Sequence, residues 1–201
     1  MKKNNKKLMV VGVDEAGRGP LAGPLAVGAA VLFIAPHKLS FWDRVRDSKK
    51  LSKKERAEIF IEIKKAKKEG KLDYACSMVG QEIIDRFGLT KAARLGVARA
   101  LLALSVPKKR MEVLLDGSLY APRGYKQKTI IHGDDIYKII GLASIVAKET
   151  RDKKMKKLAE KYPEYGFEIH SGYGTKFHYR ALRKNGPSPI HRRLFLRSLK
   201  H

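Results

Sequence analysis

Apolar and polar positions divide the chain into short, unbroken apolar runs and longer stretches of mixed character. The first apolar run, 8–13, is followed by a glycine-rich turn and then by a second run, 25–33. Short continuous runs rich in β-branched and small residues are typical of strands that are buried on both faces of a sheet. Three further runs predict three more strands, at 72–78, 111–115 and 128–131.

The stretches between these runs have helical character. Ser52 and Glu55 have the spacing of a capping box and predict the start of a charged helix over 53–69. We expect three further helices, at 81–87, 91–104 and 137–161. The middle of the last one is small and apolar, so it can pack closely on a sheet. Strands that come first and then alternate with helices predict a mixed α/β sheet covered by helices.

Composition adds a strong positive charge to this picture. The 201 residues suit one domain, and 44 Lys and Arg against 20 Asp and Glu give a net charge of +24. Such an excess favours binding to polyanions, either nucleic acids or anionic membrane surfaces. Cys76 is the only cysteine, which excludes an internal disulfide and fits the cytoplasm. The first apolar run is too short for a signal peptide or a membrane span, so we expect a cytoplasmic protein.

Acidic residues stand at the ends of predicted elements in this basic chain. Asp14 and Glu15 end the first strand, Asp116 ends the fourth, and Asp134 precedes the long helix. Carboxylates that converge there would repel one another unless a divalent cation neutralised them. Mg²⁺ or Mn²⁺ favours such oxygen ligands, and two ions could support in-line phosphodiester cleavage. The alternative is that each Asp is a helix cap or a solvated turn residue.

The motifs around these residues resemble those of the ribonuclease HII family. Six pieces occur in the family's order between residues 12 and 195. They are Gly12-Val-Asp-Glu-Ala-Gly-Arg-Gly-Pro20 with Gly23-Pro24; Asp47-Ser-Lys-Lys-Leu-Ser52; Leu114-Leu-Asp-Gly117; Gly133-Asp134 with Ala143-Ser-Ile-Val-Ala-Lys148 and Arg151-Asp152; His170-Ser-Gly-Tyr-Gly-Thr175; and Gly186-Pro-Ser-Pro-Ile-His-Arg192.

The resemblance implies a role for each matching residue. The catalytic metal ligands would be Asp14, Glu15, Asp116 and Asp134. The turn Gly17-Arg18-Gly19 would recognise the ribonucleotide 2′-hydroxyl, mainly through its backbone, and Tyr173 would read the same hydroxyl and press on the junction sugar. Taken alone, the turn is a tight turn and Tyr173 a packing aromatic.

The resemblance also implies a fold and an activity. The expected fold is a ribonuclease H-like mixed sheet flanked by helices, with a catalytic domain over 1–165 and a small, helical, basic segment over 166–201 that packs on it and helps to bind substrate. The expected enzyme is a monomeric endonuclease with Mg²⁺ or Mn²⁺. It would hydrolyse the RNA strand of RNA–DNA hybrids and incise duplex DNA 5′ to embedded ribonucleotides, leaving 3′-hydroxyl and 5′-phosphate ends. Related ribonuclease HIII proteins have Lys where this turn has Arg18. One departure is Ile136, where the family often has Lys.

Other basic residues have two interpretations each. Lys49 and Lys50, like the basic C-terminal segment, are candidate phosphate contacts. Lys148 and Arg151 either orient a carboxylate or a phosphate or form ordinary helix-surface pairs.

Three histidines, His170, His178 and His191, suggest zinc, but their spacing matches no compact site.

Two other functional classes compete with a nuclease. A non-catalytic, basic nucleic-acid-binding protein explains the charge equally well, but it gives no reason for acidic residues at four element ends. Membrane-surface binding lacks a segment that combines a basic face with an apolar one.

Overall fold

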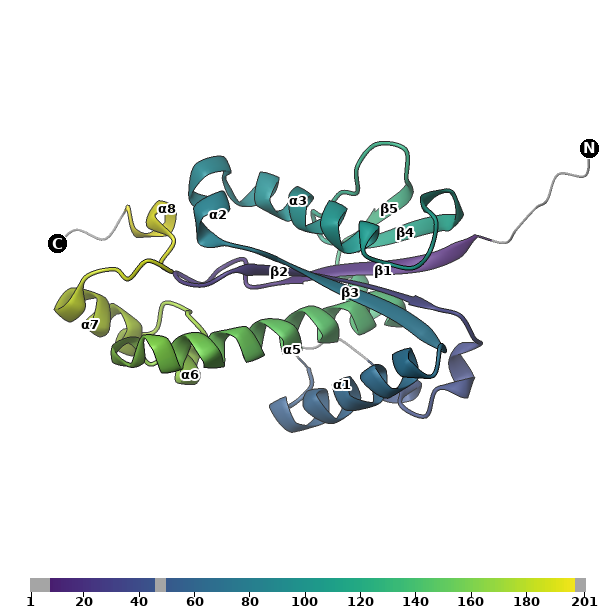
Figure 1. Cartoon of the computed structure of the whole chain (residues 1–201), viewed down its shortest axis with the longest axis horizontal. Helices are drawn as coiled ribbons and strands as arrows, with labels where there is room; N and C mark the ends of the chain where they lie inside the picture. Colours follow the sequence, from purple (N-terminus) through teal and green to yellow (C-terminus); the bar gives the residue numbers. More distant parts are fainter. Residues whose placement is uncertain (1–7, 46–49, 198–201) are drawn as a thin grey trace, which may run out of the picture.

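The computed structural model describes residues 8–45 and 50–197, and a five-stranded sheet runs through its centre (Figure 1). The strands lie in the order β3-β2-β1-β4-β5. They are β1 (Met9–Ala16), β2 (Leu25–Leu32), β3 (Leu72–Val79), β4 (Met111–Asp116) and β5 (Lys126–Ile130). The pairs β1–β2 and β2–β3 are antiparallel, whereas β1–β4 and β4–β5 are parallel. The predicted mixed sheet is confirmed.

Helices cover both faces of this sheet: α3 packs on β2 and β3, and α5 packs on β1 and β2 from the other side (Figure 1). The α-helices are α1 (Lys53–Lys68), α2 (Gln81–Phe87), α3 (Leu89–Leu102), α4 (Gly133–Ile136), α5 (Lys138–Lys161), α6 (Phe167–His170), α7 (Lys176–Asn185) and α8 (Arg193–Leu196). Single 3-10 turns occupy Pro36–Lys38, Trp42–Arg44, Lys108–Arg110 and Pro163–Tyr165. The capping box of α1 forms as predicted.

Strand alternation decides which side chains of β1 face which helix layer. Val11 and Val13 are fully buried in the core beneath α3. Gly12 between them and Asp14 after them therefore face α5. A Cβ added to Gly12 would lie 2.1 Å from the Ile139 carbonyl oxygen, and one added to Gly28 on β2 would lie 2.3 Å from that of Ala143. The two glycines let the long helix touch the sheet backbone.

The C-terminal segment returns to the end of β1. Its helices pack on the second half of α5 through an apolar cluster that is separate from the core beneath α3 and includes Met155 and Phe167. Beyond α7, the chain runs beside residues 21–23: the Gly23 N–H donates to the Ile190 carbonyl at 2.9 Å, and the Arg192 N–H donates to Leu21 at 2.8 Å. This pairing brings the end of the described chain next to the turn that follows β1 (Figure 1).

Some element boundaries differ from the predictions. β1 continues through Asp14 and Glu15 to Ala16, because these residues still pair with β2. α4, a single turn, was not predicted. β5 begins two residues earlier than predicted, because lysines occupy its exposed edge positions. Among the described residues, no helix combines the length and the apolar character needed to cross a bilayer.

Candidate metal centre

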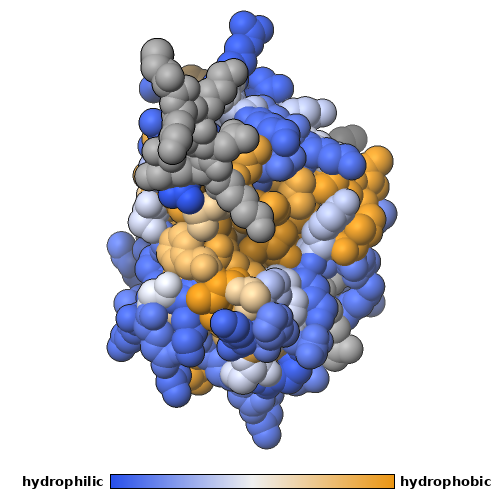
Figure 2. Space-filling model, turned by 90° about the vertical axis from the view of Figure 1, so that its right-hand side faces the viewer, coloured by the Kyte–Doolittle hydropathy of each residue, from blue (hydrophilic) through white to orange (hydrophobic). Residues whose placement is uncertain are grey.

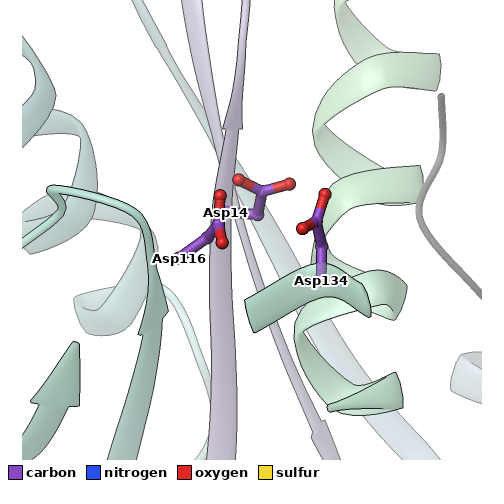
Figure 3. Close-up of side chains that lie close together, drawn as sticks. All are labelled: Asp14, Asp116 and Asp134. Carbon is purple, nitrogen blue, oxygen red and sulfur yellow. The ribbon is translucent and has the colours of Figure 1, made fainter. Parts of the chain in front are cut away.

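Three aspartates converge where β1 and β4 end. Asp14, Asp116 and Asp134 each offer a carboxylate oxygen, and these oxygens all lie within 4.8 Å of one another. Figure 3 shows the three carboxylates turned toward a common point from β1, the end of β4 and α4. Within the described ranges, no other group of His, Cys, Asp and Glu gathers in this way.

Strand register explains why two of the aspartates meet. Val13 pairs with Leu115 across the parallel strands β1 and β4, and both side chains are buried beneath α3. The next residue of each strand projects to the opposite face. Asp14 and Asp116 therefore lie next to each other on the face that carries α5.

The third aspartate is held in place from β4. The backbone N–H of Gly133, the first residue of α4, donates a hydrogen bond of 2.7 Å to Oδ1 of Asp116. Asp134 follows immediately and is only 4% exposed. The carboxylate of one ligand candidate thus anchors the turn that presents another.

Burial and mutual repulsion make this cluster a poor place for uncompensated negative charge. Asp14 is 4% exposed, and burial raises its pKa well above the usual value. The charges of Glu15 and Asp116 raise this pKa further, although hydrogen bonds with Ser144 and the Glu15 N–H lower it. An all-oxygen donor set in which burial disfavours the charged form of Asp14 fits a hard divalent cation, which would stabilise that charge.

Glu15, the fourth predicted ligand, is not part of this cluster. It follows Asp14 in the same strand, and its charge is close enough to raise the pKa of Asp14. Its Oε1 accepts a 3.1 Å hydrogen bond from Nη1 of Arg18. The Glu15 carboxylate is therefore paired with Arg18 rather than gathered with the three aspartates.

The predicted recognition turn lies directly beyond β1, beside the predicted tyrosine. Gly17 is buried with φ at +92°, a conformation that favours glycine, and Gly19 is exposed. A Cβ added to Gly19 would lie 3.8 Å from Cε1 of Tyr173, whose side chain is 45% exposed. The structure thus brings the turn and the aromatic ring together at the surface.

The basic residues predicted to contact phosphate lie in different surroundings. Lys50 is exposed and forms an ion pair with Asp135, the neighbour of Asp134. Lys49 lies outside the described residues. Lys148 forms an ordinary helix pair with Asp152 at 2.8 Å.

Both interpretations offered for Arg151 are wrong. Its side chain is fully buried and donates hydrogen bonds to the backbone carbonyls of Ala22, Pro24 and Ser171.

The three histidines form a buried group beneath Tyr173, although their spacing along the chain indicates no common site. Nδ1 of His178 donates to the Tyr173 carbonyl at 2.9 Å, and its Nε2 lies 2.9 Å from Nε2 of His191. His170 stacks on His178 with ring centroids 4.5 Å apart. Their ring nitrogens are engaged in hydrogen bonds, which leaves the lone pairs unavailable for zinc.

An apolar groove lies where β1 begins and is lined by residues that include Leu8, Val10, Phe33 and Tyr137. Figure 2 shows apolar side chains gathered on this end of the molecule. Ile136 is 62% exposed at the groove. None of the clustered carboxylates lines the groove. The candidate site for metal binding is therefore the aspartate cluster and not the groove.

Comparison with known proteins gives one consistent result. The family profile described as Ribonuclease HII matches residues 11–198. A Ribonuclease HII of Lactobacillus gasseri is 44% identical over 191 residues, which cover 94% of this chain and 72% of that protein. Among solved structures, a chain of the PCNA:RNase HII complex from Archaeoglobus fulgidus aligns with a TM-score of 0.74 and 25% identity, covering 96% of both chains. The ribonuclease H2 of Pyrococcus horikoshii OT3 aligns with a TM-score of 0.68 and 31% identity, covering 93% of both chains.

Proposed function

We propose, on the premise that this chain belongs to the ribonuclease HII family of endoribonucleases, that it cuts the RNA strand of RNA–DNA hybrids and incises duplex DNA 5′ to an embedded ribonucleotide. The convergence of Asp14, Asp116 and Asp134 is the observation that carries this proposal. A non-catalytic binding protein, the alternative expected from charge alone, does not fit membership of an enzyme family.

The carboxylate cluster supports metal-dependent hydrolysis. We assign Mg²⁺ or Mn²⁺ to the three aspartates, with Glu15 as a fourth ligand once its pairing with Arg18 is released. When two ions are bound together with substrate, they supply Lewis acidity for the attacking water and for the leaving oxygen. The protein's own contribution is to hold these carboxylates in place on β1, β4 and α4 before substrate arrives.

The proposed cut is an in-line hydrolysis. A water oxygen forms a bond to the phosphorus on the 5′ side of the ribonucleotide, and the bond from phosphorus to the preceding 3′ oxygen breaks. The 3′ oxygen leaves as a hydroxyl and the phosphate stays on the ribonucleotide. The products therefore carry 3′-hydroxyl and 5′-phosphate ends.

Recognition of the ribonucleotide is assigned to the turn and the tyrosine beside it. The 2′-hydroxyl distinguishes RNA from DNA at a given position, and it both donates and accepts hydrogen bonds. The exposed end of the turn Gly17-Arg18-Gly19, at Gly19, brings backbone groups within reach of such a hydroxyl, and the Tyr173 ring next to Gly19 can pack on the sugar.

The basic surface would hold the nucleic-acid backbone. We propose that Lys50 leaves Asp135 to contact phosphate, together with Lys49 and basic residues of the C-terminal segment from residue 166. We also propose that the protein acts as a monomer in the cytoplasm. Sedimentation analysis across concentration tests the monomer, and localisation of a tagged chain tests the compartment.

A defined duplex tests the proposed activity. One DNA strand carries a single ribonucleotide, and the labelled duplex is incubated with the protein and either Mg²⁺ or Mn²⁺. We expect one nick on the 5′ side of the ribonucleotide, and none in the same duplex without it. A duplex that stays intact with both ions would overturn the proposal.

A further inference from the structure

Two buried arginines that form no ion pair with a described acidic residue lie behind the recognition turn. Arg151 and Arg192 are both fully buried, and within the described chain their hydrogen-bond acceptors are backbone carbonyls. Burial lowers the pKa of both, and the charge of Arg151 helps to bring the pKa of Arg192 to about 9. Burying two neighbouring cations is unfavourable, so their positions call for a specific explanation.

Arg192 donates hydrogen bonds to two consecutive peptide carbonyls of the turn. Its Nη2 donates to the Gly17 carbonyl at 2.7 Å, and its Nη1 donates to the Arg18 carbonyl at 2.9 Å. Its Nε donates to the Gly23 carbonyl at 2.9 Å. The planar guanidinium supplies these donors in a fixed fork, which an ammonium group cannot reproduce.

These hydrogen bonds from Arg192 fix the direction of two backbone N–H groups. In a planar trans peptide, the carbonyl of one residue and the N–H of the next point in opposite directions. Because the carbonyls of Gly17 and Arg18 point inward to Arg192, the N–H groups of Arg18 and Gly19 point away from it. Neither N–H donates a hydrogen bond to another described residue, and Gly19 is exposed. Arg192 thus creates an outward pair of backbone donors.

The residue before Arg192 reaches the other half of the proposed recognition site. The Ser188 N–H donates to Nδ1 of His191 at 2.9 Å, so the His191 proton is on Nε2. This Nε2–H points to Nε2 of His178 at 2.9 Å, and Nδ1 of His178 donates to the Tyr173 carbonyl. One chain of hydrogen bonds therefore runs from His191 to the backbone of the tyrosine.

We propose that His191 and Arg192 form a positioning element that sets the outward N–H pair and the Tyr173 ring at a fixed spacing. The inference rests on the proposed function, because it explains how the two halves of the ribonucleotide site are aligned. The segment is itself anchored: the Ala22–His191 bridge and the bond from the Arg192 N–H to Leu21 join it to the strand that leaves the turn. His191 and Arg192 act through other residues and do not touch substrate.

Substitution of Arg192 separates positioning from general stability. Arg192→Lys keeps the charge and loses the fork. We expect kcat on the single-ribonucleotide duplex to fall by about 10- to 100-fold, because small misplacements of a recognition group have effects of this size. KM and Mn²⁺ affinity should change by less than about threefold, because the basic surface and the carboxylates are untouched.

A matched control uses the buried arginine that joins α1 to α5. Arg56 is 5% exposed and pairs with Glu149 at 2.8 Å, away from the turn. Arg56→Lys should lower thermal stability but leave kcat near that of the unmodified protein. Unchanged kcat in folded Arg192→Lys, or an equal loss in Arg56→Lys, would overturn the proposal.

The hydrogen-bond chain from His191 to Tyr173 is tested by comparing a substitution that keeps the donor with one that removes it. His191→Gln places an amide donor near the position of Nε2, whereas His191→Leu removes the donor at similar size. We expect Gln to retain most of the kcat on the single-ribonucleotide duplex, and Leu to lose it with little change in KM. Equal kcat in the two folded variants would contradict the role of the hydrogen-bond chain.

A measurement on the unmodified protein needs neither substrate nor folded variants. ¹⁵N relaxation should give the Arg18 and Gly19 amides order parameters like those of β1, about 0.85, if the turn is held rigid. Values below about 0.6 would show that Arg192 does not fix the turn. Absence of cleavage by the unmodified chain would count against the proposed function alone, because the relaxation experiment is independent of activity.

Discussion

The backbone N–H of Gly133 donates a 2.7 Å hydrogen bond to the carboxylate of Asp116, and this bond joins the end of β4 to the turn that carries Asp134. The two aspartates are therefore parts of one rigid arrangement. Asparagine at position 116 could still accept this hydrogen bond through its side-chain carbonyl. A change from carboxylate to amide should thus remove charge without moving α4.

We predict that Asp116→Asn abolishes cleavage but not binding. Loss of a ligand carboxylate should lower the single-turnover cleavage rate by at least about 100-fold. Affinity for an RNA–DNA hybrid should stay within about threefold, because the basic surface is unchanged. Gel-shift and single-turnover assays on one hybrid measure both quantities.

Glu112→Gln is the matched control for this variant. Glu112 lies on the same face of β4, four residues earlier, and pairs with Lys126 at 2.9 Å. Its substitution should leave both rate and affinity near those of the unmodified protein. Cleavage by Asp116→Asn at the rate of this control would rule out Asp116 as a ligand.

Tyr173 should matter for single ribonucleotides. The ring is 45% exposed beside Gly19, so Tyr173→Ala removes the surface expected to pack on the junction sugar. We expect kcat on the single-ribonucleotide duplex to fall by at least about tenfold. Tyr120→Ala, at a tyrosine that is 52% exposed elsewhere, is the control, and equal kcat in the two variants would count against the assignment.

The sequence predicted most of the fold because its signals are local. Apolar runs located the strands, and Ser52 with Glu55 located the start of α1. Asp14 and Asp116 could be foreseen as neighbours, since each directly follows an apolar run that predicts a strand of the same sheet. The single turn of α4 was missed because four residues carry no periodicity.

Long-range packing explains what the sequence could not show. Arg192 contacts a turn about 175 residues earlier in the chain, and only the folded segment reveals it. His178 and His191 lie 13 residues apart with no spacing that marks them as a pair. The pairing of Glu15 with Arg18 likewise depends on the folded turn and carries no signal in the sequence.

Because α5 touches the backbone of the sheet, adding one methyl group at the contact should clearly lower the free energy of unfolding. A Cβ at position 28 would lie 2.3 Å from the Ala143 carbonyl oxygen, and neither backbone can easily move. Gly28→Ala should lower the free energy of unfolding by about 1–3 kcal/mol, the usual effect of overpacking. Chemical denaturation measures this change.

Gly80→Ala provides the comparison. Gly80 has an ordinary φ of −67°, and the nearest atom to an added Cβ is the flexible end of Glu82 at 3.0 Å. The change in the free energy of unfolding should stay below about 1 kcal/mol. A smaller loss for Gly28→Ala than for Gly80→Ala would contradict the close approach of α5.

Stability should depend on pH through His191. Burial, followed by the charge of His178, lowers the pKa of His191 from 6.5 to about 4. Between these two pH values the unfolded chain binds more protons than the folded one, so acid destabilises the fold. The contribution is complete above pH 6.5, and about 3 kcal/mol of it is lost as the pH falls to about 4.

Comparison with His191→Gln isolates this effect from other titrating groups. The stability advantage of the unmodified protein over the variant should be largest at neutral pH and should shrink on acidification. His37→Gln, at an exposed position, should show no such trend. An advantage that is constant from pH 7 to pH 4 would refute the assigned pKa.

Mn²⁺ titration without substrate tests the carboxylate cluster most directly, with binding followed by electron paramagnetic resonance. The account predicts that Asp14→Asn and Asp134→Asn each weaken Mn²⁺ binding by at least about tenfold, and that Glu112→Gln does not. Equal Mn²⁺ affinity in the unmodified protein and in both aspartate variants would contradict a metal centre at these residues.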